Sequence, residues 1–235
     1  MKIWNATRAA GAVLALSIGV SACSGGSEDE GPRFTGAEKV CDGILSGDTA
    51  RAVETMVGDK TFHGTSDGML ENTASAIKDF YAEDPDGRKY VGSKKFCAFS
   101  ARTREAGSLE IDFGIYRPDD VVGTAHAEDQ HLYRLGKRAL AGSRRSNLFF
   151  ECVSPQMDGS DKQPARVYAY SRLSTVGSWE VEDTRAVREA HLTVLHAAAL
   201  AVAKELECKN NGGLPEKVIL EPIADRVESP SAPAT

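Results

Sequence analysis

Residues 108–117 decide the fold class, and they read Ser108-Leu109-Glu110-Ile111-Asp112-Phe113-Gly114-Ile115-Tyr116-Arg117. The apolar residues of this stretch stand at every second position, with Glu110 and Asp112 between them. Successive side chains of an extended chain point to opposite faces, so one side of this segment is apolar and the other is acidic. This alternation predicts an antiparallel strand that buries one face and exposes the other.

Three further segments are expected to form strands on either side of this one along the chain, over residues 95–100, 147–153 and 166–171. Each is rich in the aromatic and β-branched residues that favour strands. The segment 147–153 has apolar side chains at neighbouring positions, which indicates a more buried strand. A short strand over residues 60–63 is also expected.

Helices are expected before and after these strands. Apolar residues at helical spacing over 37–58 are interrupted at Ser46-Gly47-Asp48, which predicts two short helices. A third helix is expected to follow Ser66 or Asp67, and the longest to run over 184–208 with Asp183 as its cap. This order of elements indicates an α+β fold, in which helices pack on one side of a mostly antiparallel β-sheet.

Four of the five cysteines are candidates for disulfides: Cys41, Cys97, Cys152 and Cys208. An even number of cysteines in a chain outside the cytoplasm predicts disulfide bonds. We favour the pairs Cys41–Cys97 and Cys152–Cys208, because each would join a helical segment to a strand, while the other two pairings stay open. A zinc site is disfavoured because the four residues include no closely spaced pair.

The N-terminus has the order of an export signal. Lys2 and Arg8 precede an apolar run of about twelve residues, Ala9 to Val20, whereas a membrane span needs roughly twenty. The run ends in Val20-Ser21-Ala22-Cys23, which resembles the lipobox of bacterial lipoproteins. That resemblance implies cleavage before Cys23, lipid on its sulfur, and a place on the extracytoplasmic face of the cell membrane. An ordinary signal cleavage after Ala22 is the alternative.

The rest of the chain is expected to form one domain between two loose segments. We expect a signal peptide over 1–22, a lipidated flexible tether over 23–36, a single α+β domain over 37–226, and a disordered tail over 227–235. Removal of residues 1–22 would change the formal net charge from −6 to −8, because it takes away two basic residues and no acid. Such a charge disfavours nucleic-acid binding, and it leaves attachment to the membrane to the lipid.

Three segments carry a resemblance that covers most of the mature chain. Residues 41–43 (CDG), 149–155 (FFECVSP) and 188–196 (REAHLTVLH) are similar to a family of uncharacterised small actinobacterial secreted lipoproteins. The resemblance implies a lipid-anchored protein outside the cytoplasm. It implies no catalytic or binding residue.

The histidines suggest little chemistry. His126 and His131 lie in an acidic segment where Zn²⁺ or Cu²⁺ is one interpretation and a solvated loop the preferred one. His191 and His196 are five residues apart on the expected last helix. They therefore point in different directions, and we expect each to make one hydrogen bond in the core or at its boundary.

Two other groups of side chains are candidates for binding. Arg138, Arg144 and Arg145, together with Arg134 and Lys137, suggest either a basic patch for an anionic envelope polymer or acidic partner, or a solvated hairpin or loop. Tyr168 and Tyr170 point to the same side of one strand. If that side is uncovered, they form an aromatic binding face; if it packs against helices, they belong to the core or its edge, which we favour.

Motifs of common catalytic sites do not occur in the sequence, including G-x-S-x-G and the phosphate-binding P-loop. We therefore expect a non-catalytic binding or assembly module of the cell envelope, without a cofactor, whose partner is an envelope protein or a small ligand. The alternative is an envelope hydrolase or a metal-dependent enzyme that uses His126, His131 and nearby carboxylates.

Overall fold

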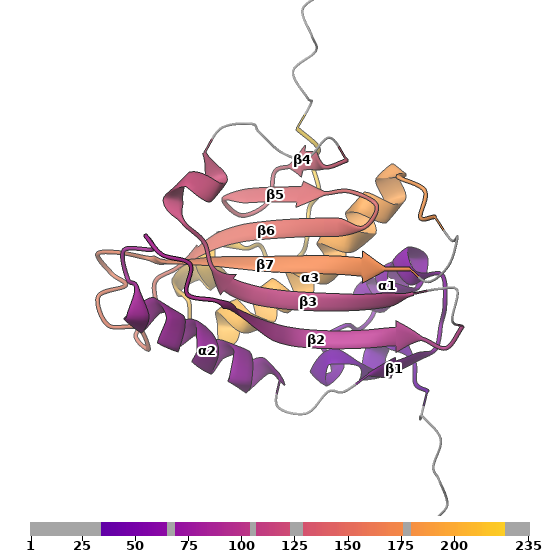
Figure 1. The fold of residues 1–235 in the computed structure, drawn as a ribbon, viewed down its shortest axis with the longest axis horizontal. Helices are drawn as coiled ribbons and strands as arrows, with labels where there is room; N and C mark the ends of the chain where they lie inside the picture. Colours follow the sequence, from indigo (N-terminus) through magenta and orange to yellow (C-terminus); the bar gives the residue numbers. More distant parts are fainter. Residues whose placement is uncertain (1–33, 65–68, 104–106, 123–128, 176–179, 224–235) are drawn as a thin grey trace, which may run out of the picture. The chain divides into compact units, whose positions relative to one another are not determined.

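A seven-stranded antiparallel sheet forms the centre of the protein (Figure 1). The computed structural model describes residues 34–64, 69–103, 107–122, 129–175 and 180–223. In spatial order the strands are β1 (Phe62–Gly64), β2 (Ser93–Ala101), β3 (Ser108–Ile115), β7 (Ala165–Ser174), β6 (Arg145–Cys152), β5 (Arg138–Ala141) and β4 (His131–Tyr133). Every neighbouring pair is antiparallel, as the alternation in β3 predicted.

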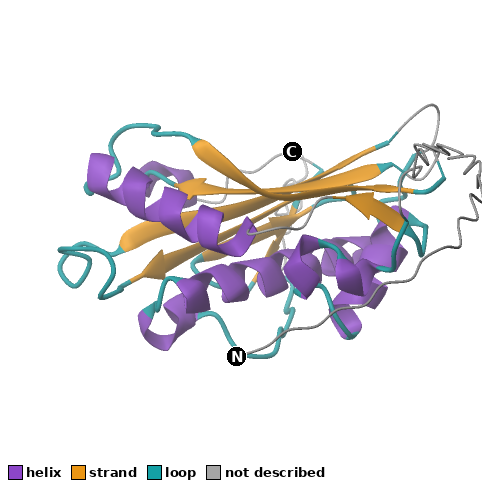
Figure 2. Cartoon of the chain, turned by 90° about the horizontal axis from the view of Figure 1, so that it is seen from below, coloured by secondary structure: helices purple, strands orange, loops and turns teal. Residues whose placement is uncertain are grey.

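Three α-helices pack on one face of the sheet, which confirms the predicted α+β architecture (Figure 2). They are α1 (Asp48–Val57), α2 (Met69–Glu83) and α3 (Arg185–Glu205). The long helix α3 contacts α1, α2 and the strands β5, β6 and β7. Among the described residues, none of the helices has the length and apolar character that a bilayer span needs.

The two faces of the sheet differ as the sequence of β3 indicates. Leu109, Ile111 and Phe113 are buried against the helices. Val167 and Ala169 of β7, together with Leu148 and Phe150 of β6, extend the same core. Glu110 and Asp112 lie on the other side, which we call the open face because none of the three α-helices covers it.

Both predicted disulfides are present. Cys41 and Cys97 join η2 (Cys41–Gly43) to β2, and Cys152 and Cys208 join β6 to the segment that follows α3. All four residues are buried in the main core. Each bond closes a loop with a sequence separation of 56 residues.

The segment before α1 differs from the predicted helix. It forms two short 3-10 turns, η1 (Ala37–Lys39) and η2, because Cys41 and Asp42 adopt left-handed φ angles of 54° and 56°. This conformation places a carboxylate oxygen of Asp42 where it accepts hydrogen bonds from the amides of Met69 and Leu70. Asp42 therefore caps α2 from a distant part of the chain, which spacing along the sequence does not show.

Three further details differ from the expectations or add to them. The strands β4 and β5 lie in a region for which no strand was predicted. The amide of Thr35, within the range expected to form the tether, pairs with the carbonyl of Phe62 at 2.8 Å. Thr184 caps α3 in place of Asp183, since its hydroxyl accepts from the amide of Val187. The residues expected to form the signal peptide and the tail lie outside the described residues.

Candidate functional site

A second apolar cluster lies on the open face of the sheet. Its centre consists of Tyr116, Leu140 and Phe149, and the rings of Tyr116 and Phe149 meet edge to face with centroids 5.2 Å apart. Val121 of the short turn η3 (Pro118–Val121) and Tyr168 of β7 pack against it. A sheet face that carried only solvated side chains would have no such cluster, so this end of the open face is built differently from the rest.

Beside this cluster is a hollow of about 520 Å³, which we call the aromatic cradle. Such a volume lies within the range of small-molecule sites. Its lining comprises Tyr90, Ile115, Tyr116, Arg117, Asp120, Asn147, Phe149 and Tyr168. The strands β6 and β7 supply the floor, while the connections before β2 and after β3 supply the walls.

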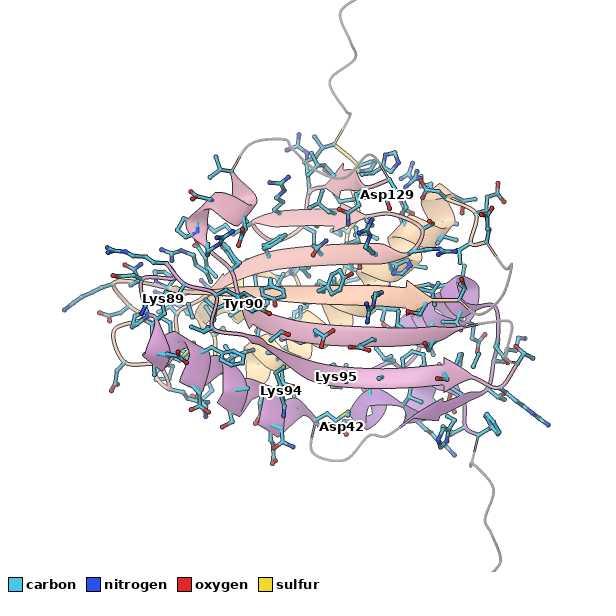
Figure 3. The ribbon with its side chains drawn as sticks, in the orientation of Figure 1. Asp42, Lys89, Tyr90, Lys94, Lys95 and Asp129 are labelled. Carbon is cyan, nitrogen blue, oxygen red and sulfur yellow. A yellow bond between two sulfur atoms is a disulfide. The ribbon has the colours of Figure 1, made fainter. Side chains whose placement is uncertain are left out.

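The four rings of the cradle differ in exposure. Tyr116 is 2% exposed and Phe149 is 9% exposed, whereas Tyr90 at the rim is 71% exposed. Figure 3 shows Tyr90 over the end of the sheet where β3 finishes. The ring of Tyr90 is thus exposed beside an apolar cluster, and apolar groups that lie together at a surface, unlike single ones, mark interaction sites.

Gly114 explains how the ring of Tyr168 fits on the sheet. These two residues are paired across β3 and β7, and a Cβ atom on Gly114 would lie 2.7 Å from both Cε1 and the hydroxyl oxygen of Tyr168. The missing side chain lets the tyrosine ring lie across β3, where its hydroxyl interacts with Ser93 and Tyr90. The ring is thereby fixed as part of the floor.

The hydroxyls of Tyr116 and Tyr168 stay protonated. Burial is the main cause that raises the pKa of Tyr168 to about 12. Burial, followed by the charge of Glu151, also raises the pKa of Tyr116. Both groups therefore remain neutral hydrogen-bonding groups at physiological pH and are not nucleophiles.

Charged groups on the cradle wall neutralise each other. The guanidinium Nη2 of Arg117 lies 3.1 Å from Oδ1 of Asp120, and Oδ2 of Asp120 accepts the amide hydrogen of Arg117 at 2.8 Å. The wall therefore offers hydrogen-bond donors and acceptors without a net charge.

A row of polar side chains continues from the cradle across the sheet. Asn147 of β6 is paired with Tyr170 of β7, Tyr170 with Asp112 of β3, and Asp112 with Lys95 of β2. Figure 3 shows Lys95 at the far end of this row, on β2. In the next row Glu110 lies 3.2 Å from the ammonium group of Lys95 and 3.9 Å from the guanidinium of Arg172.

Tyr168 and Tyr170 are thus on the uncovered side of their strand. Of the two alternatives considered for them, this arrangement is the one that permits an aromatic binding face. Tyr168 is half-buried beside the second cluster, and Tyr170 is half-buried within the polar row. The preference for a position within the helix-covered core was wrong.

The five basic residues before β6 do not form one patch. Arg134, Lys137 and Arg138 lie at the turn between β4 and β5, whereas Arg144 and Arg145 lie at the opposite end of β5. Several have acidic partners within 4 Å, as in the pairs Lys137–Glu151 and Arg145–Asp129. The cations therefore lie at the two ends of β5 and not beside one another.

A larger hollow of about 680 Å³ borders the turn between β4 and β5. Arg134, Lys137 and Glu221 line it together with several aliphatic side chains. Its only ring is that of Tyr133, which is buried, and Arg134 and Lys137 already face carboxylates. It therefore has fewer aromatic rings than the cradle, and its exposed apolar groups are the aliphatic side chains of Ile219 and Ile223.

The described residues include no group of metal ligands around His131. His131 lies 3.6 Å from a carboxylate oxygen of Asp183, and His126 is outside the described residues. Within the described ranges no three histidine, cysteine or acidic side chains are grouped as metal ligands would be. His191 and His196 are both buried on α3 and make separate hydrogen bonds.

Sequence reasoning missed Tyr90, Tyr116, Asn147 and Phe149 as parts of one site. One signal was present, because Phe149 and Phe150 are adjacent in a strand and must point to opposite faces. A large apolar side chain on each face indicates that both faces of β6 are covered there.

Comparison of the chain with protein-family models, with curated proteins and with solved structures found no match.

Proposed function

We propose that this chain is a lipoprotein held on the outer face of a membrane through Cys23, and that it acts there as a non-catalytic binding module. The ligand occupies the aromatic cradle on the open face of the sheet. The observation that carries this proposal is the cradle itself, in which rings and paired polar groups surround a hollow of about 520 Å³. The two buried disulfides support an oxidising compartment.

The geometry favours binding over catalysis. The cradle holds two tyrosines with raised pKa values and an arginine–aspartate pair, and its lining includes neither serine, cysteine, histidine nor lysine. The described histidines lie elsewhere, so we do not propose the hydrolase or metal-dependent alternative.

The anchor is tested by the substitution Cys23→Ala. Loss of the sulfur removes the atom that receives the diacylglycerol in the lipobox pathway, and acyl chains supply most of the affinity of such proteins for membranes. We expect the variant to accumulate as uncleaved precursor or to leave the membrane fraction, as measured by fractionation and intact mass. Normal retention of a lipid-free Cys23→Ala protein would contradict the proposal.

The cradle is tested by photo-crosslinking in intact cells of the native host. A benzophenone amino acid at position 90 places the reactive group at the rim, and the same group at position 34 provides the control. Phe34 is also an exposed ring, but it lies beside His63 at the β1 edge of the sheet. We expect an adduct from position 90 that position 34 does not give. Adducts of equal yield from both positions, or none from position 90, would refute the cradle as the binding site.

A further inference from the structure

The cradle and the polar row together form one continuous recognition surface. Adjacent strands lie about 4.8 Å apart, so the row from Asn147, which also lines the cradle, through Tyr170 and Asp112 to Lys95 spans roughly 14 Å across the sheet. A ligand that used the whole surface would lie across the strands, with one end among the rings and the other among polar groups.

The charges of this surface are compensated in place. Glu110 lies between Lys95 and Arg172, and Arg117 faces Asp120 within hydrogen-bonding distance. A charged ligand would have to compete with these pairs. A neutral ligand with both donors and acceptors can use the remaining capacity, because a carboxylate accepts several hydrogen bonds and a guanidinium donates five.

Asp112 stands beside a second acid within the row. Burial, followed by the adjacent Glu110 carboxylate, raises the pKa of Asp112, although Lys95 and Arg172 oppose the shift. The charged form of Asp112 is therefore disfavoured at this position in the folded protein. Two neighbouring acids on the open face offer hydrogen-bonding groups to a ligand, which is consistent with a binding role.

The rings restrict the ligand further. Tyr90 and Tyr168 offer apolar area edged by hydroxyl groups, so the group in the cradle needs an apolar face with polar edges. A quaternary ammonium group would favour an aromatic cage, but it has no hydrogen-bonding group of its own and would leave Asn147 and the Arg117–Asp120 pair without a polar partner in the ligand. A wholly apolar ligand would leave Asn147 desolvated without a partner.

We propose that the ligand is a neutral saccharide, with one sugar ring in the aromatic cradle and further rings along the row Asn147–Tyr170–Asp112–Lys95. A pyranose has an apolar C–H face, which packs on the aromatic rings, and equatorial hydroxyls that both donate and accept. This inference rests on the proposed function, since it assigns the class of ligand to the same site.

Calorimetric titration of the purified protein tests the inference. The probes are N-acetylglucosamine, its β-1,4-linked trimer, maltotriose, choline and trialanine. We expect at least one trisaccharide to bind saturably. Tyr90→Ala should weaken its binding about tenfold or more, as truncation of a central contact does, while Phe34→Ala, an exposed ring away from the cradle, should leave binding unchanged. Thermal unfolding of each variant verifies that it is folded.

A second comparison tests the direction of the ligand. Asp112→Ala should weaken binding of the trisaccharide, which reaches the row, more than fivefold, and should leave binding of any matching monosaccharide within about twofold. Equal effects on both ligands would overturn the extended arrangement.

The outcomes separate this inference from the proposed function. Binding of choline or trialanine that depends on Tyr90, without binding of any saccharide, overturns the saccharide and retains the binding module. Absence of binding by all five probes also overturns the saccharide, and the photo-crosslinking at position 90 then decides the binding module alone. Saccharide binding that is indifferent to Tyr90→Ala and to Asn147→Ala overturns both.

Discussion

Replacement of Cys152 and Cys208 together by alanine is expected to lower the free energy of unfolding by about 3–5 kcal/mol. The bond joins β6, in the body of the sheet, to the end of the longest helix, and both residues are buried. Without the bond, the unfolded chain regains the freedom of a loop with a separation of 56 residues. Denaturant unfolding under non-reducing conditions measures the difference.

The other disulfide provides a matched control. Cys41 and Cys97 have the same separation of 56 residues, so the loop term of the unfolded chain is the same for both bonds. A difference between the two double variants therefore reports contacts in the folded state. Cys41 is buried in the main core, where its turn η2 contacts α2 and β2, and we expect the Cys41→Ala, Cys97→Ala variant to retain cooperative unfolding. A loss below 1 kcal/mol for the Cys152–Cys208 pair would contradict the expected role of the bond.

The success of the disulfide prediction has a physical basis in the sequence. The strands β3, β6 and β7 could be predicted because their apolar side chains follow the period of a strand, and α3 because its apolar residues follow the period of a helix. Each half of the chain then contains one cysteine in a helical segment and one in a strand. Pairing these two within each half gives Cys41–Cys97 and Cys152–Cys208. The spacing of the apolar residues was therefore enough to predict the core and the two disulfides.

The strands β4 and β5 could not be predicted in the same way. They have three and four residues, and Arg138 begins β5 with a buried basic side chain. Such short strands depend on the neighbour with which they pair, here β6, and a local pattern contains no information about that partner. The same limit explains the division of the basic residues, because a hairpin was one interpretation of this segment but its local pattern did not show that turns at both ends of β5 would separate them.

The candidate site was only partly accessible to sequence reasoning. The shared side of Tyr168 and Tyr170 follows from the period of β7, but which face the helices cover does not, because small inward residues such as Ala165 and Ala169 resemble those of a lightly covered face. Tyr90 and Tyr116 come from connections, whose course over a sheet has no periodic signature. The cradle therefore appears only when the chain is folded.

The second large expected effect is a loss of folding stability at low pH, and its cause is the burial of His191. This histidine is 0% exposed and makes two hydrogen bonds where one was expected. Its Nε2 donates to the carbonyl of Ser143 at 3.0 Å, so the neutral ring accepts at Nδ1 from Ser171, 3.3 Å away. The hydroxyl of Ser146 lies 2.7 Å from that of Ser171. Burial lowers the pKa of His191 to about 4 from an ordinary value of 6.5.

The sign of the pH dependence follows from this shift. Below pH 6.5 the unfolded chain binds a proton on His191 that the folded protein excludes until the pH reaches about 4. Stability is therefore complete above pH 6.5 and is lost as the pH falls, by about 2 kcal/mol between pH 7 and pH 5 from this residue alone. Burial also lowers the pKa of His196, which adds a contribution of the same sign.

Denaturant unfolding at a series of pH values measures the loss, and His191→Gln should remove most of its slope between pH 7 and pH 5. The variant His196→Gln, measured in the same way, separates the contribution of His196. An unchanged slope in His191→Gln would show that the acid response comes from other groups.

The hydrogen bonds of His191 also account for two serines on the inward face of the sheet, Ser146 and Ser171, where strand alternation alone predicts apolar residues. Because the strands are antiparallel and these serines are paired across β6 and β7, one histidine on α3 satisfies both positions.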